Sequence, residues 1–140
     1  MSTSTQQRAA FEAFLDGMHT ADTDAIARHL AENVVLNSPF LAEPITGREA
    51  VANVLQTVSK LADDLTVQEV LSGENHHAAF FRLQIEDAVV DGMDYARLDA
   101  DNKIAELSVL WRPLPSIVEM QGHIAPVVGV PALELRTKGE

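Results

Sequence analysis

The sequence predicts one α+β domain, with helices in the first half and a run of antiparallel strands in the second. Across residues 11–61 the apolar residues recur with a helical period, which indicates amphipathic helices. Across residues 65–111 the period changes to two, which is typical of strands buried on one face. Turn-forming residues at 73–75 and 99–103 divide this second part into hairpins. Helices segregated from an antiparallel sheet define the α+β class.

Three helices are predicted in the first half. The first has an apolar stripe formed by Phe11, Phe14, Leu15 and Met18. A short second helix follows Asp22, which is placed to act as its N-cap. A brief β-branched run at residues 34–36 comes next, and Thr46-Gly47-Arg48-Glu49 then predicts a capping box at the start of the third helix. The apolar stripe of that helix consists of Val51, Val54, Leu55, Val58 and Leu61.

Four longer strands are predicted in the second half, at residues 65–71, 79–85, 93–98 and 104–111. Arg112-Pro113 ends the last of them. A short helix over residues 116–124 and an extended segment over residues 126–131 are expected to follow. We expect residues 1–7 to be a disordered tail, residues 8–125 to form the domain, and residues 126–140 to be a C-terminal extension.

Composition and charge exclude several classes of function. The length of 140 residues suits one domain, and the absence of cysteine excludes disulfides and thiolate chemistry. Asp and Glu number 21 against 10 Lys and Arg, so the formal net charge is −11 and we expect neither nucleic acid nor a membrane as a partner. No apolar run reaches the roughly 18 residues of a membrane span. The N-terminus lacks a secretory signal core, so a cytoplasmic location is expected. Glycine-rich nucleotide motifs are missing from the sequence, and no cofactor is expected.

Asp94 departs most clearly from the strand pattern, because aspartate is disfavoured inside strands. Alternation places residues 92, 94, 96 and 98 on one face, and these are Gly, Asp, Ala and Leu. Since this face is small and apolar apart from the acid, we expect Asp94 to point inward. Desolvation disfavours a carboxylate, so a raised pKa is predicted for Asp94. The alternative is a structural acid that pairs with backbone amides or with an arginine such as Arg82 or Arg97.

Three stretches of the sequence resemble the nuclear transport factor 2-like superfamily, which includes SnoaL-like and ketosteroid isomerase-like proteins. They are HLAENVVLNSP (29–39), PITGREAV (44–51) and MDYARLDADNKIAEL (93–107), and RPL (112–114) matches an ending common in an uncharacterised bacterial branch. The resemblance covers about residues 8–120. It implies a curved mixed or antiparallel sheet that wraps around the N-terminal helices to form a cone, also described as cystatin-like. It further implies an apolar pocket inside the cone and a homodimer formed through the outer face of the sheet.

The resemblance also implies roles for individual residues. Asp94, in its Met-Asp-Tyr context, matches an acid that stays protonated and donates to a substrate oxyanion. The general-base position falls on Ser38 and the oxyanion-tyrosine position on Phe14, so ketosteroid isomerase activity proper is not expected. Asp94 is therefore the one expected catalytic residue. The residues expected to contact a ligand are Phe14, Met18, Leu36, Ser38, Phe40, Val54, Phe81, Leu83, Asp94, Leu107, Val109 and Trp111.

Three functions remain open on the sequence alone. The first is the binding of a small, mostly apolar molecule in the cone. The second is an isomerase or cyclase type of enzyme with Asp94 as acid, and with a base supplied by the ligand, by a water held by Ser38, or by His19. The third is a non-catalytic dimerisation module whose cone is filled by its own side chains. No metal site is expected, because the neighbouring His76 and His77 lie on opposite faces of a strand.

Two further residues have alternative interpretations. Ser38 precedes a proline at the end of the first short strand, so it either contacts a polar ligand atom or caps the turn. Trp111 is the only tryptophan, and it is expected on the inward face with an indole N–H that needs a partner.

Overall fold

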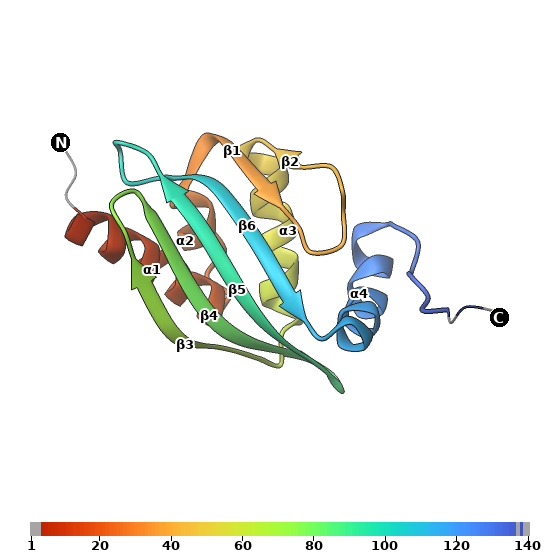
Figure 1. Cartoon of the computed structure of the whole chain (residues 1–140). Helices are drawn as coiled ribbons and strands as arrows, with labels where there is room; N and C mark the ends of the chain where they lie inside the picture. The colour runs from red at the N-terminus through yellow and green to blue at the C-terminus, as the bar shows by residue number, and fades with distance from the viewer. Residues whose placement is uncertain (1–3, 137, 139–140) are drawn as a thin grey trace.

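The computed structural model describes residues 4–136 and 138. Four helices and six strands follow one another along this part of the chain (Figure 1). The helices are α1 (Ser4–Thr20), α2 (Thr23–Arg28), α3 (Arg48–Leu61) and α4 (Leu114–Val128). The strands are β1 (Leu30–Asn37), β2 (Ile45–Thr46), β3 (Asp64–Ser72), β4 (His76–Ile85), β5 (Ala88–Leu98) and β6 (Ile104–Arg112).

All six strands form one mixed sheet in the order β2-β1-β6-β5-β4-β3. β1 and β6 are parallel, whereas the other neighbouring pairs are antiparallel. Register shifts between Val67 and Glu69 in β3, and between Arg97 and Leu98 in β5, interrupt the regular ladders. Such irregularities bend strands. The sheet covers α1, α2 and α3, which lie behind it in Figure 1, so the expected α+β cone is confirmed.

Two clusters of buried side chains fill the cone. The first joins α1, α2 and α3 to β1 and β6, and its largest members include Phe11, Phe14, Ile26, Leu36 and Leu107. The second lies toward α4 and includes Phe81, Leu83, Val90, Met120 and Ile124. Burying one such side chain contributes about 1.5–3 kcal/mol. Because Met120 and Ile124 belong to α4, this helix completes the hydrophobic core.

The two predicted helix starts have different outcomes. Asp22 caps α2 as expected, since its carboxylate accepts a hydrogen bond of 3.1 Å from the backbone N–H of Ala25. The predicted capping box at Thr46 is wrong. Thr46 pairs with Val35 in the β1–β2 ladder, and the N-cap of α3 is Gly47, with a φ of 94° and no side-chain cap. Because α3 begins at Arg48, Thr46 lies one residue before the N-cap position, and the predicted box is out of register with the helix.

The expectations for the two ends of the domain need correction. Residues 4–7 are not a disordered tail, because α1 begins at Ser4 and the Gln7 side chain is buried. Residues 1–3 lie outside the described part of the chain. The short helix expected at residues 116–124 extends from Leu114 to Val128 and therefore includes Pro126, where we expected an extended chain. Pro126 removes one helical hydrogen bond, and the burial of Ile124 and Ala125 beside it compensates for that loss.

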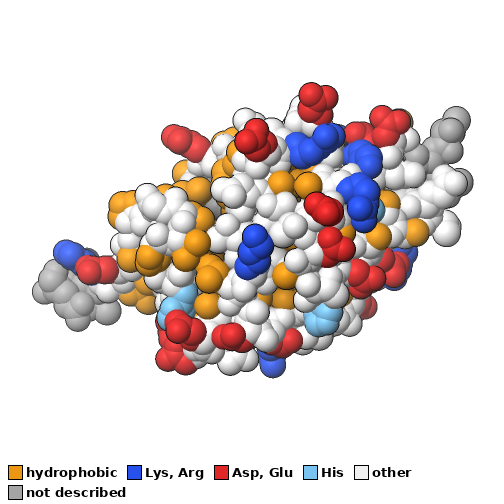
Figure 2. Space-filling view, turned by 180° about the vertical axis from the view of Figure 1, so that it is seen from behind, with side chains coloured by type: hydrophobic (Ala, Val, Ile, Leu, Met, Phe, Trp, Pro, Cys, Tyr) orange, Lys and Arg blue, Asp and Glu red, His pale blue; other side chains and the backbone are white. Residues whose placement is uncertain are grey.

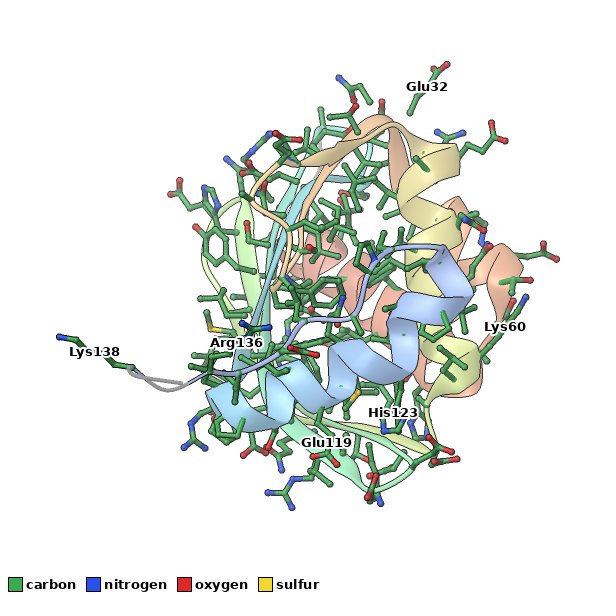
Figure 3. The ribbon with its side chains drawn as sticks, turned by 90° about the vertical axis from the view of Figure 1, so that its right-hand side faces the viewer. Glu32, Lys60, Glu119, His123, Arg136 and Lys138 are labelled. Carbon is green, nitrogen blue, oxygen red and sulfur yellow. The ribbon has the colours of Figure 1, made fainter. Side chains whose placement is uncertain are left out.

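α4 lies across the end of the cone, between the sheet and α3 (Figure 3). Two of its polar side chains make contacts. The buried Gln121 amide donates to the carbonyl of Pro131 at 2.9 Å and accepts from the N–H of Leu133 at 2.8 Å, which fixes the segment after α4. His123 contacts the carboxylate of Glu86, in the β4–β5 turn, at 2.6 Å.

Exposed apolar side chains gather at the α4 end of the molecule. Figure 2 shows them on the left of the view, beside the C-terminal segment. They include Leu114, Val127, Leu133 and Leu135.

No helix in residues 4–136 and 138 is long and apolar enough to cross a bilayer.

Candidate ligand-binding site

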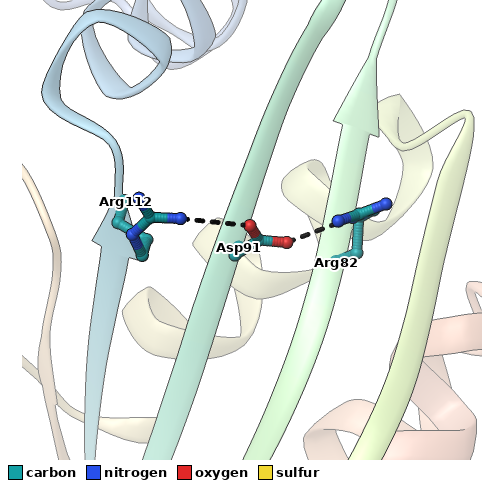
Figure 4. A network of polar contacts seen from close by, with 3 residues as sticks. All are labelled: Arg82, Asp91 and Arg112. Carbon is teal, nitrogen blue, oxygen red and sulfur yellow. Dashed lines mark hydrogen bonds and ion pairs between the residues drawn. The ribbon is translucent and has the colours of Figure 1, made fainter.

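The two faces of β5 carry acids with different surroundings. On the outer face, Asp91 forms ion pairs with Arg82 at 3.1 Å and with Arg112 at 3.5 Å (Figure 4). Asp94 lies three residues further along β5 and therefore points to the inner face. Neither Arg82 nor Arg97 pairs with Asp94, because both lie on the outer side. Arg82 pairs with Asp91, and Arg97 lies 4.0 Å from Glu106. The expected inward orientation of Asp94 is confirmed.

Asp94 lines an internal cavity of about 40 Å³ at the inner face of the sheet. The other lining residues are apolar or aromatic. Five of the contact residues predicted from the sequence come together there, namely Met18, Phe81, Leu83, Asp94 and Trp111. Four more were not among the proposed residues, namely Leu15, Val58, Leu65 and Val67. Leu65 and Val67 stand on β3, where their alternation could have identified them as inward-facing residues.

Burial raises the pKa of the Asp94 carboxyl to about 7. Desolvation is the cause, because the low-dielectric surroundings disfavour the carboxylate. Among the described residues, Asp94 has neither an ion pair nor a side-chain hydrogen bond that would favour ionisation. The acid therefore keeps its proton up to about neutral pH, and a protonated carboxyl group can donate a hydrogen bond.

The other proposed contact residues do not line this cavity. Ser38 caps a turn, since its hydroxyl accepts a hydrogen bond of 3.1 Å from the N–H of Leu41. Phe14 is fully buried in the first cluster, where its ring stacks against that of Phe11. The remaining proposed residues pack in the core without lining the cavity, namely Leu36, Phe40, Val54, Leu107 and Val109.

Gly92 shapes the cavity wall. It pairs with Phe81 on β4 and with Trp111 on β6, so the two aromatic residues flank it. A Cβ atom at Gly92 would lie 2.3 Å from Cζ of Phe81. The Phe81 ring therefore lies directly over the glycine, which only a residue without a side chain permits.

The histidines lie outside the cavity. His19 is exposed at the end of α1, where its Nδ1 atom contacts the carbonyl of Leu65, so it is not placed to act as a base on a ligand in the cavity. His76 is exposed and its Nδ1 atom contacts the hydroxyl of Tyr95 at 2.9 Å. His77 is buried between Ser72 and Gln7. Burial, and then the charges of nearby Arg8 and His76, lower its pKa.

One group of potential metal ligands occurs within residues 4–136 and 138. Oxygen atoms of Asp87 and Glu119 and a ring nitrogen of His123 all lie within 4.8 Å of one another. Figure 3 shows Glu119 and His123 on the same helix, α4. Both carboxylates are exposed, and His123 already contacts Glu86 and Asp87. The contacts join α4 to the β4–β5 turn, and nothing further in the structure indicates a bound ion.

Comparison with known proteins agrees with this fold. The SnoaL-like domain family matches residues 11–107. A steroid delta-isomerase from Nocardioides simplex is 28% identical over 122 residues, which cover 82% of this chain and 97% of the relative. Two solved structures have a TM-score of 0.81. One is a steroid delta-isomerase from Pseudomonas aeruginosa, 20% identical, with 88% of this chain and 91% of that chain covered. The other is an uncharacterised protein with a cystatin-like fold from Silicibacter pomeroyi, 21% identical, with 88% and 87% covered.

The family match, the steroid delta-isomerase relative and the shared fold together define an NTF2-like protein. Within that class, the chain belongs to the SnoaL-like domain family.

Proposed function

We propose that this protein binds a small, mostly apolar molecule in the cone, and that Asp94 donates a hydrogen bond to an oxygen atom of that molecule. The observation that carries the proposal is a carboxyl group without a charged partner in a cavity that is otherwise apolar. Apolar cavities with few polar groups are the usual form of small-molecule sites. The protonated carboxyl group supplies the orientation, and the aliphatic and aromatic walls supply most of the affinity.

The size of the cavity limits the ligand. About 40 Å³ is the space of a few water molecules and is well below the ~150 Å³ cavity that binds benzene in another protein. A ring-sized ligand therefore needs side chains to move aside. Met18 is suited to this, because it is only partly buried and a thioether chain repacks easily. A steroid skeleton needs a larger change, in which α4 moves away from the end of the cone.

An isomerase is the second candidate, and the 28% identity to a steroid delta-isomerase favours it. Against it, Ser38 is engaged in a turn and Phe14 has no hydrogen-bond donor, so Asp94 lacks partners for proton transfer. We expect no turnover of a 5-ene-3-ketosteroid above the uncatalysed rate. Turnover that Asp94→Asn reduces by a larger factor than it reduces affinity would establish an enzyme instead.

A pair of matched ligands tests the binding proposal. Cyclohexanone and methylenecyclohexane differ in one group, since =CH₂ replaces the carbonyl oxygen. We expect both to shift the NMR signal of the Met18 methyl group in a saturable way, with cyclohexanone binding about two- to tenfold more tightly because of one extra hydrogen bond. Asp94→Leu should remove this preference, whereas Asp91→Leu, on the outer face of the same strand, should retain it. If neither ligand binds, the proposed site is wrong.

We further propose that two copies associate through the outer face of the sheet. Phe80, Tyr95 and Leu110 expose apolar surface there, on three neighbouring strands. Clustered exposed apolar side chains are typical of protein interfaces. Sedimentation should show a dimer for the wild type and a monomer for Leu110→Glu. A wild-type protein that stays monomeric at high concentration would contradict this proposal.

A further inference from the structure

Trp111 is a second residue with a polar atom among those that line the cavity. It lies near the end of β6 and lines the cavity together with Asp94. Asp94 pairs with Val109, so Trp111 occupies the diagonal position on the same face of the sheet. Diagonal neighbours are about 7–8 Å apart, within the combined reach of a carboxyl group and an indole ring. The two side chains therefore face the same space.

The indole N–H of Trp111 has no hydrogen-bond partner among the described residues, although its nitrogen is buried. Leaving such a donor unpaired in the folded protein costs about 1–3 kcal/mol. Buried polar groups are paired in the great majority of cases, so an exception requires an explanation. Asn102 holds the one other buried side-chain atom of this kind in residues 4–136 and 138, and it lies in the β5–β6 turn. Trp111 alone of the two lines the cavity.

Two groups are available to the indole N–H. One is the ring of Phe40, whose centroid is 5.7 Å from that of Trp111 at an interplanar angle of 55°. A contact between an N–H and a ring is weak. The other is an acceptor atom on a molecule in the cavity. Since indole can only donate, that atom must be an acceptor.

We propose that Trp111 is a second ligand-binding donor, and that its indole N–H and the carboxyl group of Asp94 bind the same oxygen atom of the ligand. This inference rests on the proposed function. A carbonyl or enolate oxygen fits two converging donors, because it carries two lone pairs and no hydrogen. The ligand is thus narrowed to small, mostly apolar molecules that carry an oxygen acceptor with two free lone pairs.

The composition of the chain makes the test specific. Trp111 is the only tryptophan, so a ¹⁵N-labelled sample shows one indole N–H signal. We expect cyclohexanone to move the indole proton downfield, with the same dissociation constant as the shift of the Met18 methyl group. Methylenecyclohexane should move it far less. Trp111→Phe should weaken cyclohexanone about two- to tenfold and leave methylenecyclohexane almost unchanged.

A Phe40→Leu variant separates the two possible partners of the N–H group. The indole shift caused by cyclohexanone should persist in this variant, and its loss would show that the signal reports the Phe40 ring. An indole proton that moves equally with both ligands also overturns the inference, because that response reflects packing alone. The inference is also overturned if Trp111→Phe binds cyclohexanone as tightly as the wild type does. If cyclohexanone still shifts the Met18 signal in that case, the proposed site itself stands. If neither ligand binds the wild type, the site and the inference fail together.

Discussion

Replacing Asp94 by asparagine should stabilise the protein at alkaline pH. The substitution keeps the shape of the side chain and removes the charge. In the folded protein the pKa of Asp94 is raised from 3.8 to about 7 by burial. Between these two values the folded protein retains a proton that the unfolded chain releases. The free energy of unfolding of the wild type should therefore fall as pH rises through this window and become level above it.

The size of the effect follows from the shift. Each pKa unit corresponds to about 1.36 kcal/mol, so the shift of roughly three units sets an upper limit of about 4 kcal/mol. Asp94 retains some accessible surface, which reduces the effect. We therefore expect the free energy of unfolding of Asp94→Asn to exceed that of the wild type by about 2–4 kcal/mol at about pH 8.5. Near about pH 3 the free energies of unfolding of the two proteins should be nearly equal, because the wild-type acid is then mostly neutral in both states.

Urea unfolding followed by the fluorescence of Trp111 measures this difference at each pH, at one fixed protein concentration. The slopes of the unfolding curves should match between variants. Asp91→Asn is the control, because Asp91 lies on the same strand and its ion pairs are exposed. Its effect should stay within about 1 kcal/mol at every pH. A difference between Asp94→Asn and the wild type that does not grow with pH would refute the buried, protonated acid.

Three smaller predictions concern Gly92, Gln121 and Ser38. Gly92→Ala should destabilise the protein by about 1–3 kcal/mol in urea unfolding, because the new methyl group collides with the Phe81 ring; an unchanged stability would mean that the ring moves freely. Gln121→Ala should cost about 1–3 kcal/mol and increase proteolysis of the C-terminal segment, since it removes both hydrogen bonds that hold that segment; unchanged proteolysis would contradict this. Ser38→Ala should cost at most about 1 kcal/mol and leave cyclohexanone affinity unaltered, because Ser38 caps a turn at Leu41; a lost affinity would return Ser38 to the site.

Periodicity predicted the parts of the fold that depend on local burial. Alternation along β4 and β5 predicts the correct inward faces, so the sequence alone is sufficient to place Phe81, Leu83 and Asp94 on the inner side of the sheet. In β5, Asp91 pairs with arginines on the surface, whereas Asp94, three residues later, lines the cavity. A strand has only two faces. The small and apolar residues at positions 92, 96 and 98 share a face with Asp94, and this was sufficient to predict which way Asp94 points.

The position of the cavity could not be predicted from the sequence. It depends on α4, whose side chains Met120 and Ile124 fill one end of the cone. The length of this helix could not be predicted because it contains Pro126. A proline normally indicates the end of a helix, but packing can override this preference. The remaining space is bounded by Leu15 and Val58, whose helical stripes predicted burial but not which space they border. The role of Gly92 also escaped prediction, since a contact between neighbouring strands leaves no periodic pattern.

The pH dependence of cyclohexanone affinity tests most directly whether a protonated Asp94 binds a ligand oxygen in the cone. With a pKa of about 7, the affinity should be constant below about pH 6 and fall by about two- to tenfold to a lower plateau above about pH 8, since the carboxylate cannot donate. Methylenecyclohexane should show a much smaller change, and Asp94→Asn should bind cyclohexanone equally at every pH. A wild-type affinity for cyclohexanone that is constant from about pH 5 to about pH 9 would contradict the role assigned to Asp94.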